Sequence, residues 1–207
     1  AELQEARRTL AGELDSTPEI MTMIALDEPR TSRILERGQY DLPGRTVEPD
    51  TPEGILPFPD DQPRDRLGLA RWTTDPRNPL TARVAVNRLW EIAFGRGLVL
   101  TSEDFGSQGS IPSHPKLLDR LAIDLIESGW NVKAMLERIV NSASYRQSSI
   151  TTQDKRRIDP GNARLSRGPS NRLTAEMLRD QALAASGLLV DTLGGPSVHP
   201  YQPAGLW

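Results

Sequence analysis

Apolar residues recur along most of this chain at intervals of three and four positions, the spacing that puts them on one side of an α-helix. The stretches with this pattern are residues 2–14, 64–73, 79–94, 113–128, 131–140 and 171–186. The stretch Ser148–Pro169 is polar and shows little periodicity. Because mostly short loops join the helical stretches, we expect a mainly α fold, built as a compact multi-helix bundle.

Residues that commonly cap helices stand at the ends of several of these stretches. Asn78 is expected as an N-cap with Pro79 at the first helical position, and Gly95 is expected to end that helix. Ser113 and Asn131 are expected to cap the next two helices, because their side-chain oxygens can accept hydrogen bonds from the first backbone N–H groups. These residues predict where three of the helices begin.

The N-terminal part of the chain has a different pattern. Ile20–Leu26 and Thr31–Leu35 are short apolar runs with turn-forming residues between them, which predicts a small β-hairpin. Residues 38–63 are dense in proline and glycine, which predicts a long extended connector. We therefore expect an N-terminal part, 1–63, and a helical domain, 64–207. Both ends of the chain resemble cuts through a longer protein, the helical domain being truncated at its C-terminus.

Composition and charge exclude several classes of function. The chain has 207 residues, 37% of them hydrophobic and 26% charged, with a net charge of −3. Charges of both signs are interspersed, so no overall basic field points to nucleic acid, and we expect no nucleic-acid partner. The absence of cysteine excludes thiolate metal sites and covalently attached haem in this chain, and no apolar run is long enough to span a membrane. We therefore expect no cofactor and no metal site.

Several long motifs resemble one family. They read RLGLARWTTDPRNPLTARVAVNRLWEIAFGRGLVLTSEDFGSQGSIPSHPKLLDRLA, ESGWNVKAMLERIVNSASYRQSS, NRLTAEMLRDQALAASGLL and GGPSVHPYQPAGLW. Over roughly residues 20–207 the chain resembles the planctomycete-type family known as domain of unknown function 1553. Its members usually lie toward the C-terminus of large exported proteins, with a cytochrome-c-like domain upstream. The resemblance implies a periplasmic or cell-surface location, redox or polysaccharide association, and any haem in a separate upstream domain; it supplies no catalytic residue.

One candidate site lies on the helix expected over residues 79–94. Arg83, Asn87 and Glu91 are four residues apart, so they share a face. Such a face could bind an anionic or sugar ligand through the planar guanidinium. The alternative is a polar network that ties the helix to the loops around it, which is the commoner role of such clusters.

A second group of polar residues lies on the last helix. Glu176 and Asp180 are one turn apart, and Arg172 and Arg179 flank them. A pair of carboxylates can hydrolyse a glycosidic bond when the two lie across a cleft. Two carboxylates on one helix face beside arginines are more typical of a lattice of ion pairs.

The remaining candidates lie in connectors. Asp104 lies in a glycine-rich turn, and His114 stands at a helix start, where the helix dipole favours a neutral imidazole suited to a general base or a metal ligand. The alternative is that His114 orders its own loop. A zinc site would require His114, His199 and a carboxylate such as Asp104 to converge. Tyr145 and Arg146 follow a helix and are candidates for binding a sugar.

These observations support two functions. The first is an accessory or interaction domain of an exported multidomain protein, whose partners are the neighbouring domains and, in one variant, carbohydrate. The alternative is a glycan-acting hydrolase or ligand-binding domain. Its candidate catalytic residues are Asp104, His114 and Glu176, and its candidate ligand-binding residues are Arg83, Asn87, Tyr145, Arg146 and Arg179. The sequence does not decide whether the domain is an enzyme.

Overall fold

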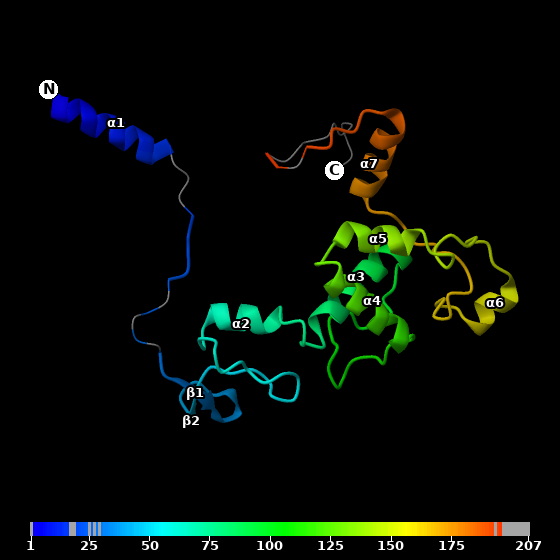
Figure 1. Cartoon of the computed structure of the whole chain (residues 1–207), viewed down its shortest axis with the longest axis horizontal. Coiled ribbons are helices and arrows are strands. Elements are labelled where there is room, and N and C mark those ends of the chain that lie inside the picture. The colour runs from blue at the N-terminus through cyan, green and yellow to red at the C-terminus, as the bar shows by residue number, and fades with distance from the viewer. Residues whose placement is uncertain are drawn as a thin grey trace. The chain divides into compact units, whose positions relative to one another are not determined.

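A computed structural model describes residues 2–16, 20–24, 26, 28, 30–192 and 194–195 (Figure 1). In chain order the elements are α1 (Glu2–Ser16), β1 (Ser32–Leu35), the 3-10 helix η1 (Glu36–Gly38), β2 (Pro43–Val47), α2 (Arg66–Thr73), α3 (Thr81–Phe94), α4 (Pro115–Glu127), α5 (Val132–Val140), α6 (Gln153–Ile158) and α7 (Ala175–Ser186). The mainly α fold with a small hairpin is therefore confirmed. The chain forms two compact units, which divide between Leu69 and Ala70 within α2.

The hairpin of the N-terminal unit pairs different segments from those expected. β1 runs antiparallel to β2, with Ser32 opposite Val47 and an irregularity before Leu35. No strand forms at the described residues of Ile20–Leu26, so this part of the prediction was wrong. The second strand comes instead from the segment expected to be a connector. Gly44 lets β2 approach β1, because a Cβ at this position would lie 2.9 Å from the Ile34 carbonyl oxygen.

The core of the C-terminal unit is formed by α3, α4, α5 and the loop after α3. The cluster of buried side chains comprises Val86, Trp90, Ala93, Phe94, Leu98, Val99, Leu118, Leu121, Leu125, Met135 and Ile139. α3 contacts both α4 and α5, which lie beside it in green in Figure 1. Trp90 stacks on Phe94 with ring centroids 4.2 Å apart. The helical stripes predicted from the sequence for these three helices supply this core.

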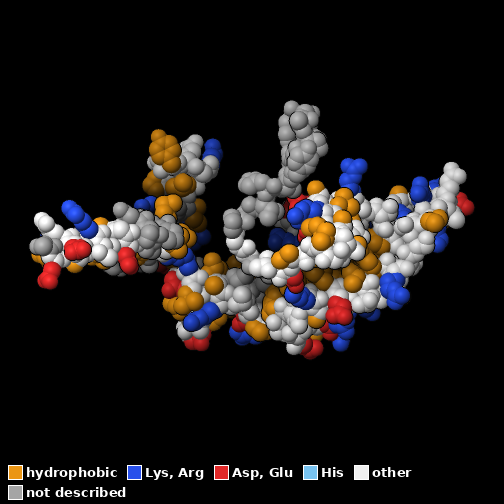
Figure 2. All heavy atoms as spheres, turned by 90° about the horizontal axis from the view of Figure 1, so that it is seen from above, with side chains coloured by type: hydrophobic (Ala, Val, Ile, Leu, Met, Phe, Trp, Pro, Cys, Tyr) orange, Lys and Arg blue, Asp and Glu red, His pale blue; other side chains and the backbone are white. Residues whose placement is uncertain are grey.

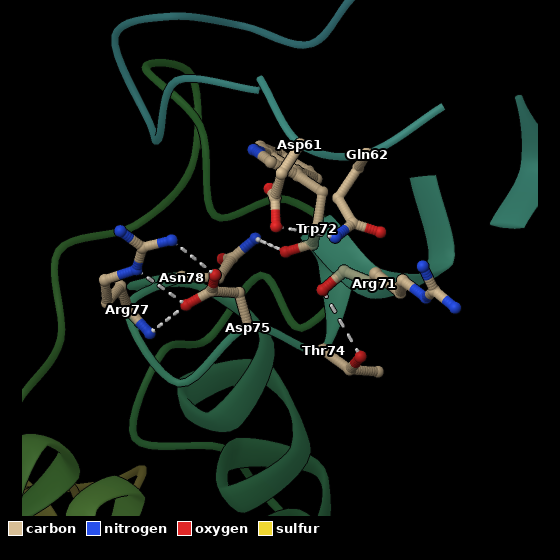
Figure 3. Close-up of polar contacts among 8 residues, drawn as sticks. All are labelled: Asp61, Gln62, Arg71, Trp72, Thr74, Asp75, Arg77 and Asn78. Atoms are coloured by element: carbon tan, nitrogen blue, oxygen red, sulfur yellow. Dashed lines mark hydrogen bonds and ion pairs between the residues drawn. The ribbon is translucent and has the colours of Figure 1, made fainter. Parts of the chain in front are cut away.

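The start of α3 differs from the expected one. The helix begins at Thr81, not at Pro79, and its N-cap is Leu80. The Asn78 side chain caps the turn before it, accepting from the Leu80 N–H at 3.0 Å and donating to the Trp72 carbonyl at 3.3 Å. Figure 3 shows Asn78 directed at Trp72, so this buried amide links the end of α2 to the start of α3.

The other helix ends show which capping signals hold. Gly95 ends α3 in the left-handed conformation at φ 74°, and Asn131 caps α5 by accepting from the Ala134 N–H at 3.0 Å, as predicted. Ser113 is not a cap. His114 occupies that position before α4, and the Ser113 hydroxyl donates to the Leu98 carbonyl at 3.1 Å. This hydroxyl therefore bonds to the preceding loop and caps no N–H group of α4.

The last helix is shorter and more exposed than expected. α7 begins at Ala175 because Thr174 caps it, accepting from the Met177 N–H at 3.2 Å, and Gly187 ends it at φ 73°. None of its 12 residues is buried. The polar stretch before it, expected to lack regular structure, contains the six-residue helix α6.

Truncating a core leucine of α4 should destabilise the protein far more than truncating an exposed leucine of α7. Leu125 of α4 is 0% exposed, so Leu125→Ala should reduce the free energy of unfolding by about 2–5 kcal/mol. Leu178 of α7 is 53% exposed, so Leu178→Ala should change it by less than about 0.5 kcal/mol. Urea titrations followed by circular dichroism measure both. Equal losses would show that α7 packs as tightly as α4.

Candidate functional site

Asn87, the central residue of the predicted polar face of α3, is wholly buried and holds the loop that follows the helix. It is 0% exposed. Its Oδ1 accepts from the Val99 N–H at 2.8 Å, and its Nδ2 donates to the Val99 carbonyl at 3.0 Å and to the Ser102 hydroxyl at 3.0 Å. One amide side chain therefore pairs both backbone groups of Val99, as a neighbouring strand would.

Glu91, one turn further along α3, extends this arrangement. The Ser102 hydroxyl donates to its carboxylate at 2.6 Å, so the hydrogen bonds run from Asn87 through Ser102 to Glu91. We refer to Asn87, Glu91, Val99 and Ser102 as the Asn87 network. Both N–H groups of the Asn87 amide are used within it. The side chain that sequence reasoning made a ligand-binding candidate therefore has its donors engaged inside the protein.

Gly97 makes the Asn87 network sterically feasible. A Cβ at this position would lie 2.5 Å from Asn87 Nδ2 and 2.8 Å from Oδ1, and closer still to the Val99 carbonyl oxygen. Real Cβ atoms do not approach other atoms so closely. The chain at Gly97 consequently has to pass against the Asn87 amide without a side chain.

Arg83 makes contacts in a different direction. Its Nε donates to Asp119 of α4 at 2.7 Å, and its guanidinium also donates to the Pro79 carbonyl. Arg83 and Asp119 line a cleft of about 310 Å³ between α3 and α4. No hydrogen bond or ion pair in the described part of the chain joins Arg83 to Asn87 or Glu91. The shared helix face thus serves two separate contacts.

Asp104 and His114, the loop candidates, each contact their own neighbourhood. The Asp104 carboxylate accepts from the Gly106 N–H at 2.7 Å, and its carbonyl accepts from the Thr101 hydroxyl at 2.7 Å. His114 Nδ1 lies 3.1 Å from the Ser113 hydroxyl. No hydrogen bond among the described residues joins Asp104 to His114. Both side chains are half-buried, and the Asp104 carboxylate closes a turn of the loop between α3 and α4.

Tyr145 and Arg146 follow α5. The Tyr145 ring packs edge-on against Phe94 with centroids 5.5 Å apart, which attaches it to the core cluster. Arg146 is exposed, and its backbone N–H donates to the Ser142 carbonyl at 3.1 Å. Tyr145 therefore contributes to packing, while the Arg146 side chain is open to solvent.

Glu176 and Arg179 lie on the exposed helix α7. The backbone N–H of Glu176 and the Thr174 hydroxyl hydrogen-bond the Glu176 carboxylate and lower its pKa below the ordinary value. Arg179 pairs with the adjacent Asp180 at 3.5 Å. A carboxylate kept ionised by a helix start is a poor general acid, because a general acid needs a raised pKa.

Metal binding by the candidate residues finds no support in the described ranges. Within them, no group of three or more His, Asp or Glu side chains could hold a metal ion. His199, the other histidine of the suggested zinc site, lies outside the described residues. Nor does any helix among the described residues have the length and apolar character needed to cross a membrane.

Sequence reasoning missed a second polar centre, the loop after α6. The buried Asp159 carboxylate accepts from the N–H groups of Ala163 and Arg164, each at 2.8 Å. Arg167 donates to the carbonyls of Asp159 at 2.9 Å and Pro160 at 2.6 Å. The turn-forming run Asp-Pro-Gly-Asn at 159–162 is a signal that could have revealed it.

Fold and site define a small helical domain whose polar candidates are mostly engaged in holding its loops. The family model described as "Protein of unknown function (DUF1553)" matches residues 65–207, more than half of the chain. The chain belongs to this family, as its motifs indicated. No match was found to a curated protein or to a solved structure.

Removing the Asn87 amide should destabilise the domain strongly. Asn87→Ala leaves the buried N–H and carbonyl of Val99 without partners, each costing about 1–3 kcal/mol. Gly97→Ala should be comparably harmful, because the new methyl group displaces the same amide. Gly54→Ala is the matched control, since no atom lies within 4 Å of its added Cβ. Chemical denaturation measures all three; a neutral Asn87→Ala would contradict the structural role.

Acid should weaken the Asp159 loop. Burial raises the Asp159 pKa, but the N–H groups of Arg164 and Ala163 and the nearby arginines outweigh it, so the pKa lies below the ordinary 3.8. A lowered folded-state pKa means stability that is fully present above the unfolded-state pKa and lost as pH falls through the folded-state pKa. Asp159→Asn should therefore cost about 2 kcal/mol at pH 7 and progressively less below about pH 4.

The control for the acid experiment is Asp154→Asn, at an exposed position of α6. Unfolding free energies from urea titrations between about pH 2 and pH 7 should show no comparable loss for this variant. A difference between wild type and Asp159→Asn that stayed constant across that range would contradict the assignment.

Proposed function

We propose that this chain is an accessory domain that acts by contacting another folded domain, and that it performs no catalysis of its own. The observation that carries the proposal is the exposure of α7. Large apolar side chains on and beside this helix are open to solvent: Leu173, Met177, Leu178, Leu188, Leu189 and Val190. We call these six residues the α7 surface.

A helix of this length ordinarily needs packing. α7 has 12 residues, and helices of about 12–15 residues or fewer are marginal in water unless an apolar face is buried. Thr174 and Gly187 cap its two ends, but none of its residues is buried against the described part of the chain. Large apolar side chains exposed on and beside one helix are a common feature of interaction sites.

The polar candidate residues support the same function, because most of them hydrogen-bond or pair with other groups of the chain. Asn87 and Glu91 hold the loop after α3, Arg83 pairs with Asp119, and Asp104 closes its own turn. An active site needs groups that are free to meet a substrate and within hydrogen-bond reach of one another.

The described residues show no concentration of one charge sign on the face seen in Figure 2. Charged side chains of both signs are interspersed there, with apolar side chains exposed among them.

The family resemblance suggests the setting of this contact. We propose that the partner is a neighbouring domain of the same exported protein, in the periplasm or at the cell surface. The redox or polysaccharide association of such a protein would then reside in other domains, with any haem held upstream. In this setting the domain described here would fix the position of its neighbours.

Photo-cross-linking in the intact natural protein tests the α7 surface. A benzoylphenylalanine at Leu178 should cross-link to peptides from outside residues 1–207, because this side chain is placed at the proposed contact. The matched control is the same residue at Ile123, an exposed apolar position of α4. Mass spectrometry identifies the products. Cross-links that are equal at both positions, or confined to this chain, would refute the proposal.

A ligand screen separates this function from the hydrolase alternative. The accessory-domain proposal predicts that no neutral glycan raises the melting temperature of the chain. It also predicts that the wild type hydrolyses no glycan, so that Asp104→Asn and His114→Gln have no activity to abolish. Glycan arrays and thermal-shift assays on the wild type provide the measurement. Turnover of a glycan that Asp104→Asn abolishes would establish the enzyme instead.

A further inference from the structure

A small polar cleft lies where the end of α3 meets the loop after α6. Its volume is about 210 Å³, and it is lined by residues of two segments, 94–96 and 160–171. Arg96 and Arg167 are the only charged side chains among the lining residues, so the cleft carries two positive charges and no lining carboxylate. A cleft lined by cations without a carboxylate favours an anionic ligand.

Three consecutive backbone carbonyls of one turn accept hydrogen bonds from the two guanidinium groups. Arg167 donates to the carbonyls of Asp159 and Pro160, and Arg96 donates to that of Gly161 at 2.7 Å. Within the described part of the chain, neither arginine forms an ion pair with a carboxylate at salt-bridge distance. The buried Asp159 carboxylate attracts Arg167 electrostatically, but it accepts its hydrogen bonds from two backbone N–H groups and does not line the cleft.

The arginines keep donors for a ligand. A guanidinium has five N–H groups, and the hydrogen bonds above use one of Arg96 and two of Arg167. The planar fork of donors matches the oxygens of sulfate, phosphate and carboxylate. Ser170 and Asn171 also line the cleft and offer neutral hydrogen-bonding groups beside the two charges. The Asn162 side chain, which lines it too, is hydrogen-bonded to the backbone N–H and carbonyl of Arg167.

Close packing fixes the walls of the cleft. A Cβ at Gly95 would lie 2.8 Å from Asn171 Cβ, and one at Gly161 would lie 2.5 Å from an amino nitrogen of Arg96. Gly168 has a similarly close approach, to the Gln147 carbonyl, and its N–H donates to the Ser148 carbonyl at 3.0 Å. The walls of the cleft are therefore shaped by glycines whose backbone packs directly against neighbouring atoms. This packing, in addition to the arginine side chains' own conformations, positions the guanidinium groups.

We propose that this cleft binds a small oxyanion, either a free anion or the sulfate, phosphate or carboxylate group of a sugar. This site is independent of the α7 surface. It differs from the hydrolase alternative because it uses neither Asp104 nor His114 nor Glu176. A cleft of this volume accommodates one such group with part of a sugar ring.

Nuclear magnetic resonance titration tests the proposal. Sodium sulfate should shift the amide signals of Asn162 and Asn171 in a saturable manner, while sodium chloride at equal ionic strength should not. Galactose 6-sulfate and galactose form the second arm. Tighter binding of the sulfated sugar than of free sulfate would identify a sugar-borne group, and equal binding would identify the free anion. No saturable shift with either sulfated probe would overturn the proposal.

Two matched variants locate the binding. Arg96→Gln removes one charge but keeps an N–H donor for the Gly161 carbonyl, and it should weaken sulfate binding roughly tenfold. Arg88→Gln makes the same change at an exposed position of α3 and should leave binding unchanged. Equal weakening by both variants would show only general charge attraction. Wild-type titrations stand on their own if Arg96→Gln disturbs the fold.

Discussion

The C-terminal unit depends on one amide side chain. Asn87 pairs both backbone groups of Val99, and this contact turns the chain back after Gly95 so that Leu98 and Val99 enter the core. Ser113 then hydrogen-bonds the Leu98 carbonyl through both its N–H and its hydroxyl, which places the start of α4. The packing of α4 on α3 thus follows from a loop that a single buried amide holds in place.

This constraint changes where a function should be sought. A polar residue whose donors and acceptors are paired inside the protein cannot also serve a ligand without leaving its partners unsatisfied. Asn87 is in this position. Glu91 and Asp104 each use one carboxylate oxygen to hold a loop, so their pattern along the sequence reflects loop architecture. The α7 surface and the cleft at Arg96 and Arg167 are different. The first exposes apolar side chains to solvent, and the second presents guanidinium N–H groups that no described residue uses.

The sequence predicts local features well and tertiary partners poorly. The stripes of α3, α4 and α5 and the ends at Gly95 and Asn131 follow from spacing and capping preferences alone. Asn78 and Ser113 have the residue types of N-caps, but neither is the N-cap of its helix. Asn78 caps the preceding turn and also donates to the Trp72 carbonyl, and Ser113 donates to the Leu98 carbonyl, partners that only the fold brings near. The spacing of Arg83, Asn87 and Glu91 is compatible with a ligand site and with a loop anchor, the anchor being the commoner role of such clusters. The partner strand of the hairpin was misplaced because pairing depends on close approach at Gly44.

Native-state hydrogen exchange at the Val99 amide tests the central role of Asn87 most directly. This N–H is buried and donates to Asn87 Oδ1. If the contact holds the unit together, the Val99 amide should exchange only through global unfolding, with the same free energy as the amides of Leu121 and Leu125 in α4. Exchange of Val99 through local opening, at a free energy well below that of the α4 amides, would contradict the account.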